Sequence, residues 1–129
     1  MSSPGRSALL AVFALAAGAT VAACGGAPAS APPVPSGVVA VEAKEYTFTP
    51  STLTVGAGKV TFYVRNAGNE EHEFEIFRGD QVVDEIEGLV PGLAKNLTLD
   101  LAAGEYTFVC KLNGHDQIGM KGTLTVTGS

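Results

Sequence analysis

The sequence predicts an all-β fold, an antiparallel β-sandwich of seven to eight short strands, for the segment that starts at residue 38. Apolar and polar residues alternate with a period of two in several runs of this segment, which is typical of strands with one buried face. Turn-forming residues separate the runs, and no stretch shows a convincing 3.6-residue period. Short strands that each have one apolar face bury it by packing as two sheets.

The strands can be assigned in chain order from this alternation. The first clear run places Val60, Phe62 and Val64 on one face. The other runs with the same period are 73–76, 96–101, 106–108 and 124–126. The turn signals that separate the strands are 56–58, 66–69, 78–80, 91–92 and 103–104. Residues 82–93 have the least regular pattern, because acidic and apolar residues are mixed there.

Residues 1–23 are expected to be a lipoprotein signal peptide. One positive charge, Arg6, precedes an apolar run over residues 8–17, which is too short and too weakly flanked to be a dependable membrane span. The run Val-Ala-Ala-Cys at 21–24 resembles the lipobox of bacterial lipoproteins, which implies that Cys24 is lipidated and begins the mature chain. The alternative is an ordinary signal peptide cut after an Ala-x-Ala-like site, which leaves Cys24 without a role.

Residues 24–37 are expected to be the lipidated cysteine followed by a Pro/Ala/Gly-rich tether. The tether has no charge and no periodicity, so it cannot bury enough apolar area to fold. The alternative is a disordered N-terminus without a spacing role. With the signal peptide, this segment predicts an exported protein that is lipid-anchored to the outer face of the cytoplasmic membrane or to a periplasmic membrane face. The remaining residues, 38–129, form one small domain.

The domain carries four potential metal ligands of the kind that copper prefers. Cys110, His115 and Met120 stand at equal intervals and supply a thiolate, an imidazole and a thioether. With one more histidine, these groups make the trigonal His₂Cys site with a weak axial Met that serves single-electron transfer. The only other histidine of the chain is His72. These four residues therefore point to a site for one copper ion.

The expected strands bring the four residues to one end of the sandwich. Cys110 ends one strand and Met120 opens the next, so His115 lies in the loop that joins them. His72 begins a different strand, just after the turn at 66–71. Loops at one end of a two-sheet sandwich cluster, so two loops can converge on one ion. His115 is expected at an exposed loop position rather than in the core.

Cys110 also admits other roles. Exported cysteines are usually paired, so the single cysteine of an exported domain is explained by metal ligation or by pairing between molecules. A lone buried cysteine is often an inert hydrophobic residue. Zinc could occupy the same ligands, although structural zinc sites favour Cys and His without a thioether. A Cys-His nucleophile pair would need an orienting acid and an oxyanion motif, and the sequence shows no marked one.

The segment 38–127 resembles the cupredoxins, the small blue copper proteins, and among them the rusticyanin and auracyanin branch. The resemblance rests on the spacing Cys-x₄-His-x₄-Met, on its flanks at 104–110 and 119–124, and on the early segments 46–50 and 64–68. It implies a Greek-key sandwich with type 1 copper. His72, Cys110 and His115 would be the short-bonded ligands and Met120 the long axial one, holding one ion that cycles between Cu(I) and Cu(II).

One position departs from the family pattern. Many cupredoxins have Asn directly after the first histidine ligand, where it helps to join the two ligand loops, whereas this chain has Glu73. Lys111, directly after Cys110, is interpreted as a partner for a nearby acidic group. Because groups around the ligands set potential and rigidity, the resemblance implies ligand identity and leaves the reduction potential open.

Charge and apolar loop residues suggest how a partner would bind. The chain has a net charge of −5, and eight of its thirteen acidic residues lie between residues 70 and 87. This region could steer a cationic redox partner such as a basic cytochrome face, or it could be a solvated surface that only aids solubility. The negative balance disfavours nucleic-acid binding. By the resemblance, a partner docks where the loop histidine reaches the surface, here at Leu112, Gly114, His115 and Ile118.

The sequence thus predicts a membrane-tethered, monomeric cupredoxin that carries single electrons outside the cytoplasmic membrane and is not an enzyme. One rival function is copper delivery or buffering with the same ligands, although delivery usually needs more exposed Met or His. Another rival is a non-redox domain similar to the cupredoxin-like part of periplasmic iron-uptake proteins, which the complete Cys, His and Met set weakens.

Overall fold

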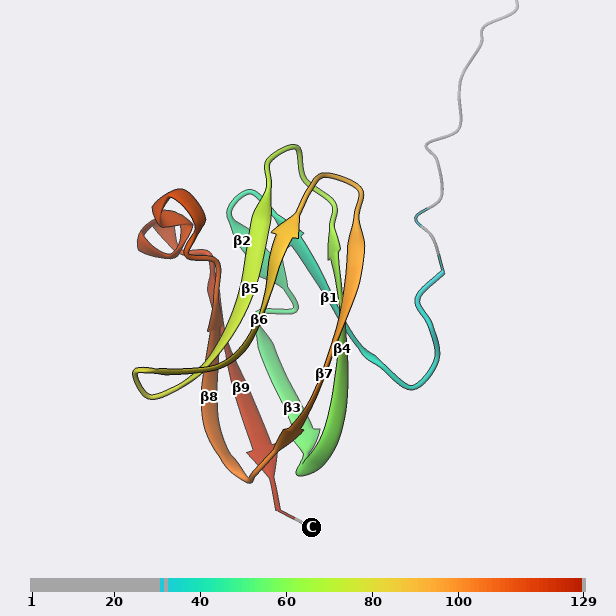
Figure 1. Cartoon of the computed structure of the whole chain (residues 1–129), viewed down its shortest axis with the longest axis vertical. Helices are drawn as coiled ribbons and strands as arrows, with labels where there is room; N and C mark the ends of the chain where they lie inside the picture. Colours follow the sequence, from blue (N-terminus) through green and yellow to red (C-terminus); the bar gives the residue numbers. More distant parts are fainter. Residues whose placement is uncertain (1–30, 32, 129) are drawn as a thin grey trace, which may run out of the picture. The chain divides into compact units, whose positions relative to one another are not determined.

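The computed structural model describes residue 31 and residues 33–128, which form a two-sheet β-sandwich (Figure 1). One sheet has the order β2-β1-β4-β7 and the other the order β3-β9-β8-β5-β6. The elements are β1 (Val39–Lys44), β2 (Thr47–Thr49), β3 (Thr52–Gly56), β4 (Gly58–Asn66), β5 (His72–Arg78), β6 (Gln81–Leu89), β7 (Ala94–Leu101), β8 (Gly104–Val109), the 3₁₀ segment η1 (Leu112–Ile118) and β9 (Lys121–Thr127).

The predicted signal peptide, Cys24 and most of the tether lie outside the described residues. Residues 33–37 are exposed and form no strand, and β1 begins one residue after the expected start of the domain. Within the described part of the chain, no helix has the length and apolar character needed to cross a membrane.

The predicted all-β sandwich is confirmed, with two differences in detail. The described residues form nine strands rather than seven to eight. β1, β2 and β3 correspond to none of the alternating runs, and the three-residue β2 buries only Phe48 and is too short to show alternation. Two strand pairs, β1 with β4 and β3 with β9, are parallel, whereas the other pairs are antiparallel. The chain passes from one sheet to the other between β2 and β3, which brings these early strands beside later strands that run in the same direction.

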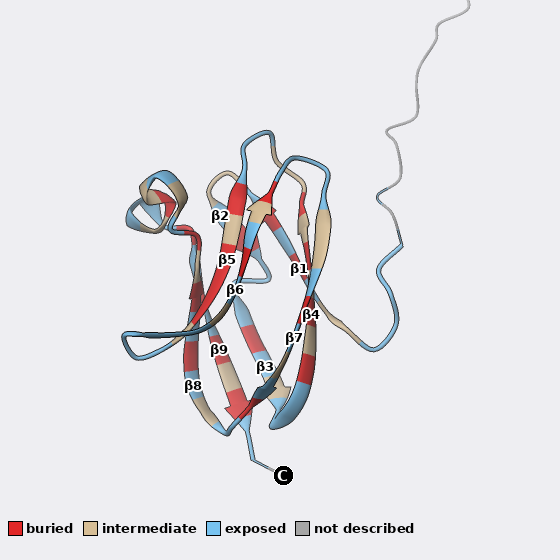
Figure 2. Cartoon of the chain, viewed as in Figure 1, coloured by how far each residue is buried: buried red, intermediate tan, exposed pale blue. Residues whose placement is uncertain are grey.

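The core lies between the two sheets and is filled by the apolar faces that the alternation predicted. Buried positions recur along most strands, with exposed or half-buried ones between them (Figure 2). Four phenylalanines form its centre, and Phe74 of β5 contacts the other three, with ring centroids 5.3–5.7 Å apart. The other three are Phe48, Phe62 and Phe108. Aromatic pairs in tilted or edge-on arrangements at these distances add to the stability that burial provides.

The irregular stretch at 82–93 contains a strand at the edge of its sheet. β6 pairs only with β5, and its sole fully buried side chains are Ile86 and Leu89. An edge strand contacts the core through few residues, so acidic residues can occupy its exposed positions without burying charge. Its last residue, Leu89, pairs with His72 at the start of β5.

Candidate metal centre

Three side chains from two distant parts of the chain meet at one end of the sandwich. His72 begins β5, Cys110 directly follows β8, and His115 belongs to η1. The Sγ atom of Cys110 lies 4.0 Å from Nδ1 of His72 and 3.4 Å from Nδ1 of His115. The three ligand atoms all lie within 4.8 Å of one another, and all three residues are buried. The structure therefore brings together three of the four predicted ligands, as a His72–Cys110–His115 cluster.

The spacing of the cluster suits a metal ion bound by one sulfur and two nitrogens. Metal–sulfur bonds of about 2.3 Å and metal–nitrogen bonds of about 2.0–2.1 Å, at 110–120° to each other, separate the ligand atoms by roughly 3.6–3.8 Å. The two measured S···N distances of 4.0 and 3.4 Å bracket that value. A thiolate with two imidazoles is also the donor set that suits copper. The residues present thus fit a copper ion without a large movement of the strands.

Met120 is fully buried directly before β9. Its N–H donates to the His115 carbonyl at 3.0 Å, and its own carbonyl accepts the N–H of Cys110 at 3.1 Å. These two backbone bonds close the loop between β8 and β9, so that Cys110, His115 and Met120 are held near one another. The role of Met120 as axial ligand stays a prediction.

Burial shifts the pKa values of two members of the cluster, Cys110 and His72. Burial raises the pKa of the Cys110 thiol, and the backbone N–H groups of Glu73 and Leu112, which donate to the sulfur, oppose that shift. Burial lowers the pKa of His72, against the raising effect of its contact with Glu45. The metal-free site therefore holds a neutral thiol and a neutral His72 imidazole near pH 7. A buried thiol with no exposed surface also disfavours pairing between molecules.

Two carboxylates that the sequence analysis did not identify contact the outer nitrogens of the histidines. Oε1 of Glu45 lies 3.3 Å from Nε2 of His72, and Oε2 of Glu70 lies 3.5 Å from Nε2 of His115. Hydrogen bonds from backbone N–H groups, that of Glu70 first, lower the pKa of Glu45 to about 2. Both histidines therefore present Nδ1 to the sulfur and Nε2 to a carboxylate.

The expected exposed position of His115 is wrong, because the residue is only 3% exposed. The ring of Tyr46 covers it at a centroid distance of 4.8 Å, and the Tyr46 hydroxyl donates to Oε1 of Glu70 at 2.9 Å. Tyr46 and Glu70 belong to turns 24 residues apart, so no local pattern in the sequence predicts that they cover the loop histidine.

Asn66 joins the loops around the site from a fully buried position. Its Nδ2 donates to the carbonyls of Glu70 and Leu89 at 2.6 and 2.7 Å, and its Oδ1 accepts the N–H of Gly68 at 2.8 Å. Its backbone also bonds to the turn at 92–93. A buried amide with all these partners stabilises the loop that leads into His72. The sequence indicated a turn at this position, within a segment (64–68) similar to cupredoxins, but not these contacts.

Glu73, which departs from the family pattern, and Lys111, which was expected to pair with an acidic group, both have defined contacts. The backbone N–H of Glu73 donates to Cys110 Sγ at 3.3 Å, a bond that does not depend on which side chain position 73 carries. Lys111 has the acidic partner expected for it, since its Nζ lies 2.8 Å from Oδ2 of Asp116. This exposed ion pair joins the residue before η1 to a residue within it and contributes little to overall stability.

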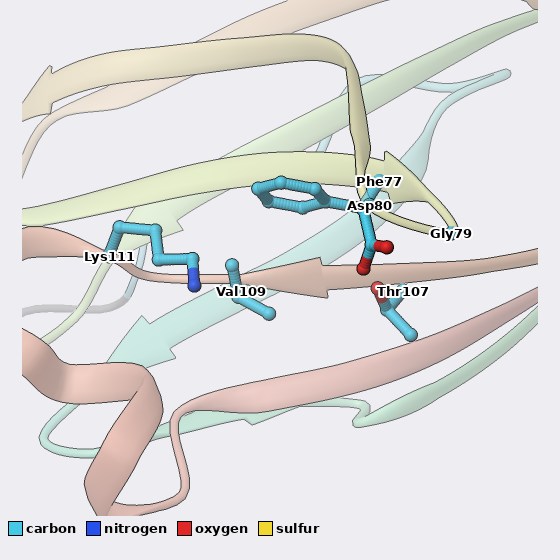
Figure 3. A pocket seen from close by; sticks show the side chains of 6 residues that line it. All are labelled: Phe77, Gly79, Asp80, Thr107, Val109 and Lys111. Carbon is cyan, nitrogen blue, oxygen red and sulfur yellow. The ribbon is translucent and has the colours of Figure 1, made fainter.

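The residues expected to line a docking surface differ in exposure. Leu112 is half-buried and packs against the core, Gly114 is half-buried, and Ile118 is 62% exposed. Ile118 is therefore the one large apolar side chain that this loop presents freely to solvent. A separate pocket lies on the outer face of β5 and β8, where Phe77 and Lys111 form part of its wall (Figure 3). None of the four predicted ligands lines it.

Comparisons with known proteins agree with this fold. The family described as the cupredoxin-like domain matches residues 8–126. The iron uptake system component EfeO of Yersinia pestis is 42% identical over 78 residues, which are 60% of this chain and 20% of that protein. EfeO of Escherichia coli K12 is 38% identical over 78 residues, 59% of this chain and 21% of that protein. The chain thus spans about a fifth of the length of these curated relatives.

Solved structures show the same fold at lower identity. Reduced auracyanin from Roseiflexus castenholzii superposes with a TM-score of 0.66 at 21% identity, covering 71% of this chain and 98% of its own. Auracyanin A, a "blue" copper protein from Chloroflexus aurantiacus, gives 0.62 at 21% identity, covering 70% of this chain and 98% of its own. Rusticyanin from Thiobacillus ferrooxidans gives 0.57 at 24% identity, covering 72% and 79%.

Proposed function

The chain belongs to the cupredoxin-like family, and we propose that it is a type 1 copper protein that carries single electrons and does not itself turn over a substrate. The observation that carries the proposal is the buried His72–Cys110–His115 cluster. Copper bound there would supply the Cu(I)/Cu(II) couple. The protein would hold the ligands in one arrangement in both states, because strands and backbone hydrogen bonds fix them.

Each ligand has a distinct chemical part in this proposal. Cys110 provides the thiolate, and His72 and His115 provide imidazoles that suit both oxidation states. Met120, which is buried beside them, would be the weak axial ligand that raises the potential. The near-complete burial of the cluster excludes water, which limits rearrangement when an electron enters or leaves.

The direct test is a redox titration of the purified protein with added Cu(II). We expect an intense visible thiolate-to-copper band that disappears on reduction and returns on oxidation, with one electron per copper. A colourless protein that retains zinc and shows no such band contradicts the proposal.

Metal affinity should rise with pH. The buried Cys110 thiol must lose its proton to ligate, and its raised pKa means that this proton is still bound at pH 7–8. His72, whose pKa is lowered, is already neutral and releases none. We expect the apparent Kd for Cu(I), measured by chelator competition, to fall about tenfold per pH unit from 7 to 8. Cys110→Ser should lack this proton release, and an equally steep dependence in that variant would contradict the assignment.

We further propose that the electron partner is a cationic protein, such as a basic cytochrome face, that docks near the loop after Cys110. Ile118→Lys should lower the second-order electron-transfer rate with cytochrome c by roughly tenfold or more, because it adds a positive charge to an exposed apolar contact. The copper spectrum should not change. Val34→Lys is the matched control, since Val34 is 53% exposed, precedes β1 and lies outside the acidic segment 70–87, so its rate should equal that of wild type. Equal rates for Ile118→Lys and wild type would exclude this docking surface.

Attachment to the outer face of the membrane through lipidated Cys24 is also a proposal, supported by the lipobox-like run at 21–24. We expect Cys24→Ala to move the protein from the membrane fraction to the soluble fraction of its host. Unchanged fractionation would contradict the anchor.

A second candidate function is metal handling in an uptake system. It is favoured by the relatives at 38–42% identity, which are iron uptake components. An electron carrier should keep its copper through repeated oxidation and reduction in the presence of a competing chelator. A delivery or buffering protein should instead lose it within a few cycles, so the copper retained after cycling separates the two functions.

A further inference from the structure

We propose that Glu45 is a positioning residue of the metal centre, which holds His72 with Nδ1 toward Cys110 and whose negative charge favours the more highly charged state of a bound metal. The first half of this inference concerns the protein alone. The second half rests on the proposed function. Neither half follows from the four-ligand pattern, which does not include Glu45.

The contacts of Glu45 converge on a single oxygen atom. Oε1 accepts the backbone N–H of Asn69 at 2.6 Å and that of Glu70 at 2.8 Å, and it lies 3.3 Å from Nε2 of His72. The side chain is only 18% exposed, and that of His72 is fully buried. Two backbone donors at charge-assisted distances fix the carboxylate in place, so it faces the imidazole from a defined position.

This position determines which nitrogen of His72 is free to ligate. A carboxylate oxygen can only accept, so Nε2 of His72 carries the proton and donates it. Nδ1 then keeps its lone pair and faces Cys110 Sγ at 4.0 Å. Carboxylates that bond the outer nitrogen of a ligating histidine fix its tautomer and raise its basicity.

The second histidine provides an internal comparison. His115 has the same arrangement, with Nδ1 3.4 Å from Cys110 Sγ and Nε2 3.5 Å from Glu70 Oε2. The Glu70 side chain is 48% exposed, so water and salt screen its charge far more than they screen that of Glu45. Of the two carboxylates, Glu45 should therefore have the larger effect on the site.

The charge of Glu45 should act on the redox equilibrium in one direction. Oxidation of a bound ion adds one positive charge to the site, and a fixed negative charge nearby stabilises that form more than the reduced form. Removal of the charge should therefore favour the reduced state and raise the reduction potential.

Gly68 makes room for this carboxylate. A Cβ atom at position 68 would overlap Oε1 of Glu45, whose side chain would have to move away. Gly68→Ala therefore displaces the carboxylate from His72 without changing the charge of the protein. This variant therefore tests whether the location of the Glu45 carboxylate matters when the carboxylate itself is retained.

The test compares Glu45→Gln, Glu45→Ala and Gly68→Ala with wild type in the full chain. Glutamine keeps an acceptor oxygen for Asn69, Glu70 and His72 and removes only the negative charge. Alanine removes the acceptor oxygen as well as the charge. Glu70→Gln is the matched control, since it makes the same change at the exposed carboxylate. The first readout uses metal-free protein, in which ¹⁵N-edited NMR of the imidazoles reports the tautomer of His72.

In metal-free wild type and Glu45→Gln, we expect the proton on Nε2 of His72. We expect a mixed tautomer in Glu45→Ala and Gly68→Ala. A wild-type His72 protonated on Nδ1, or tautomers that do not differ between wild type and Glu45→Ala, overturns the positioning role whether or not copper binds.

In protein loaded with Cu(II), we expect Glu45→Gln to shift the one-electron equilibrium toward the reduced form by about tenfold, or about 59 mV. Glu70→Gln should shift it less than Glu45→Gln. A Glu45→Gln potential equal to that of wild type, with the copper band intact, overturns the charge effect and leaves the proposed function standing. Absence of the band in wild type instead contradicts the proposed function, while the metal-free tautomer still decides the positioning role.

Discussion

Replacement of Cys110 by serine will abolish the visible thiolate-to-copper band and weaken copper binding by more than roughly 100-fold. The serine hydroxyl is a hard, neutral donor with no covalent route to copper. The two imidazoles that remain, His72 and His115, cannot supply the missing sulfur contact. The fold should persist, because serine replaces a buried thiol of nearly the same volume at the end of β8.

This result is measured by visible absorption and by metal content after dialysis against a weak chelator. Cys24→Ser is the matched control, since it removes the other cysteine of the chain, and its copper band should equal that of wild type. An unchanged band in Cys110→Ser, or a band lost only in Cys24→Ser, would show that copper binds elsewhere and would remove the basis of the proposed function.

Replacement of Phe74 by alanine will lower the free energy of unfolding by about 3–5 kcal/mol. Phe74 is fully buried between the sheets, and its ring contacts those of three other phenylalanines, so the variant leaves a large cavity in the centre of the core. A domain of this size has a total stability of about 5–15 kcal/mol, so a large share of it would be lost.

Urea unfolding at equilibrium measures this change, with Phe77→Ala as the matched control. Phe77 lies on the same strand but on its outer face, where it lines the pocket beside Lys111 (Figure 3), and its truncation should cost about 1 kcal/mol. Equal losses for the two variants would mean that the aromatic cluster is not the centre of the core.

Sequence reasoning identified the residues of the His72–Cys110–His115 cluster because few residues of the chain could form it. The chain has two histidines, and the domain has one cysteine, so ligand identity followed from residue type and spacing. The closeness of Cys110 and His115 depends on one short loop. Only the position of His72 required long-range folding, and it was predicted because β5 begins at that residue.

The side chains that contact the two histidines could not be predicted from residue type and spacing. Glu45 reaches His72 across 27 positions of the chain, and Tyr46 reaches Glu70 across 24. Neither acid belongs to an alternating run or to a ligand motif, and both resemble solvated turn residues in the sequence. The same limitation produced the wrong expectation for His115, whose burial depends on a turn that lies far from it in the chain.

The strands, too, were predicted only in part from the sequence. Alternation at period two predicted most of the strands and their buried faces, because each strand buries one side against a common core. It did not identify β1, β2 or β3, and it did not predict that β1 and β3 pair in parallel with β4 and β9. Pairing direction depends on where the chain crosses between sheets, which the local pattern does not encode.

By itself, the sequence determined the fold class, many of the buried faces and the candidate ligands for a soft metal, because these depend on residue type and local period. Only the tertiary structure decided which nitrogen of each histidine faces the sulfur, which carboxylates contact the other nitrogen, and how far water is excluded. Those properties arise where separate turns meet at one end of the sandwich. Their physical origin is a set of long-range contacts that no neighbouring residues in the chain specify.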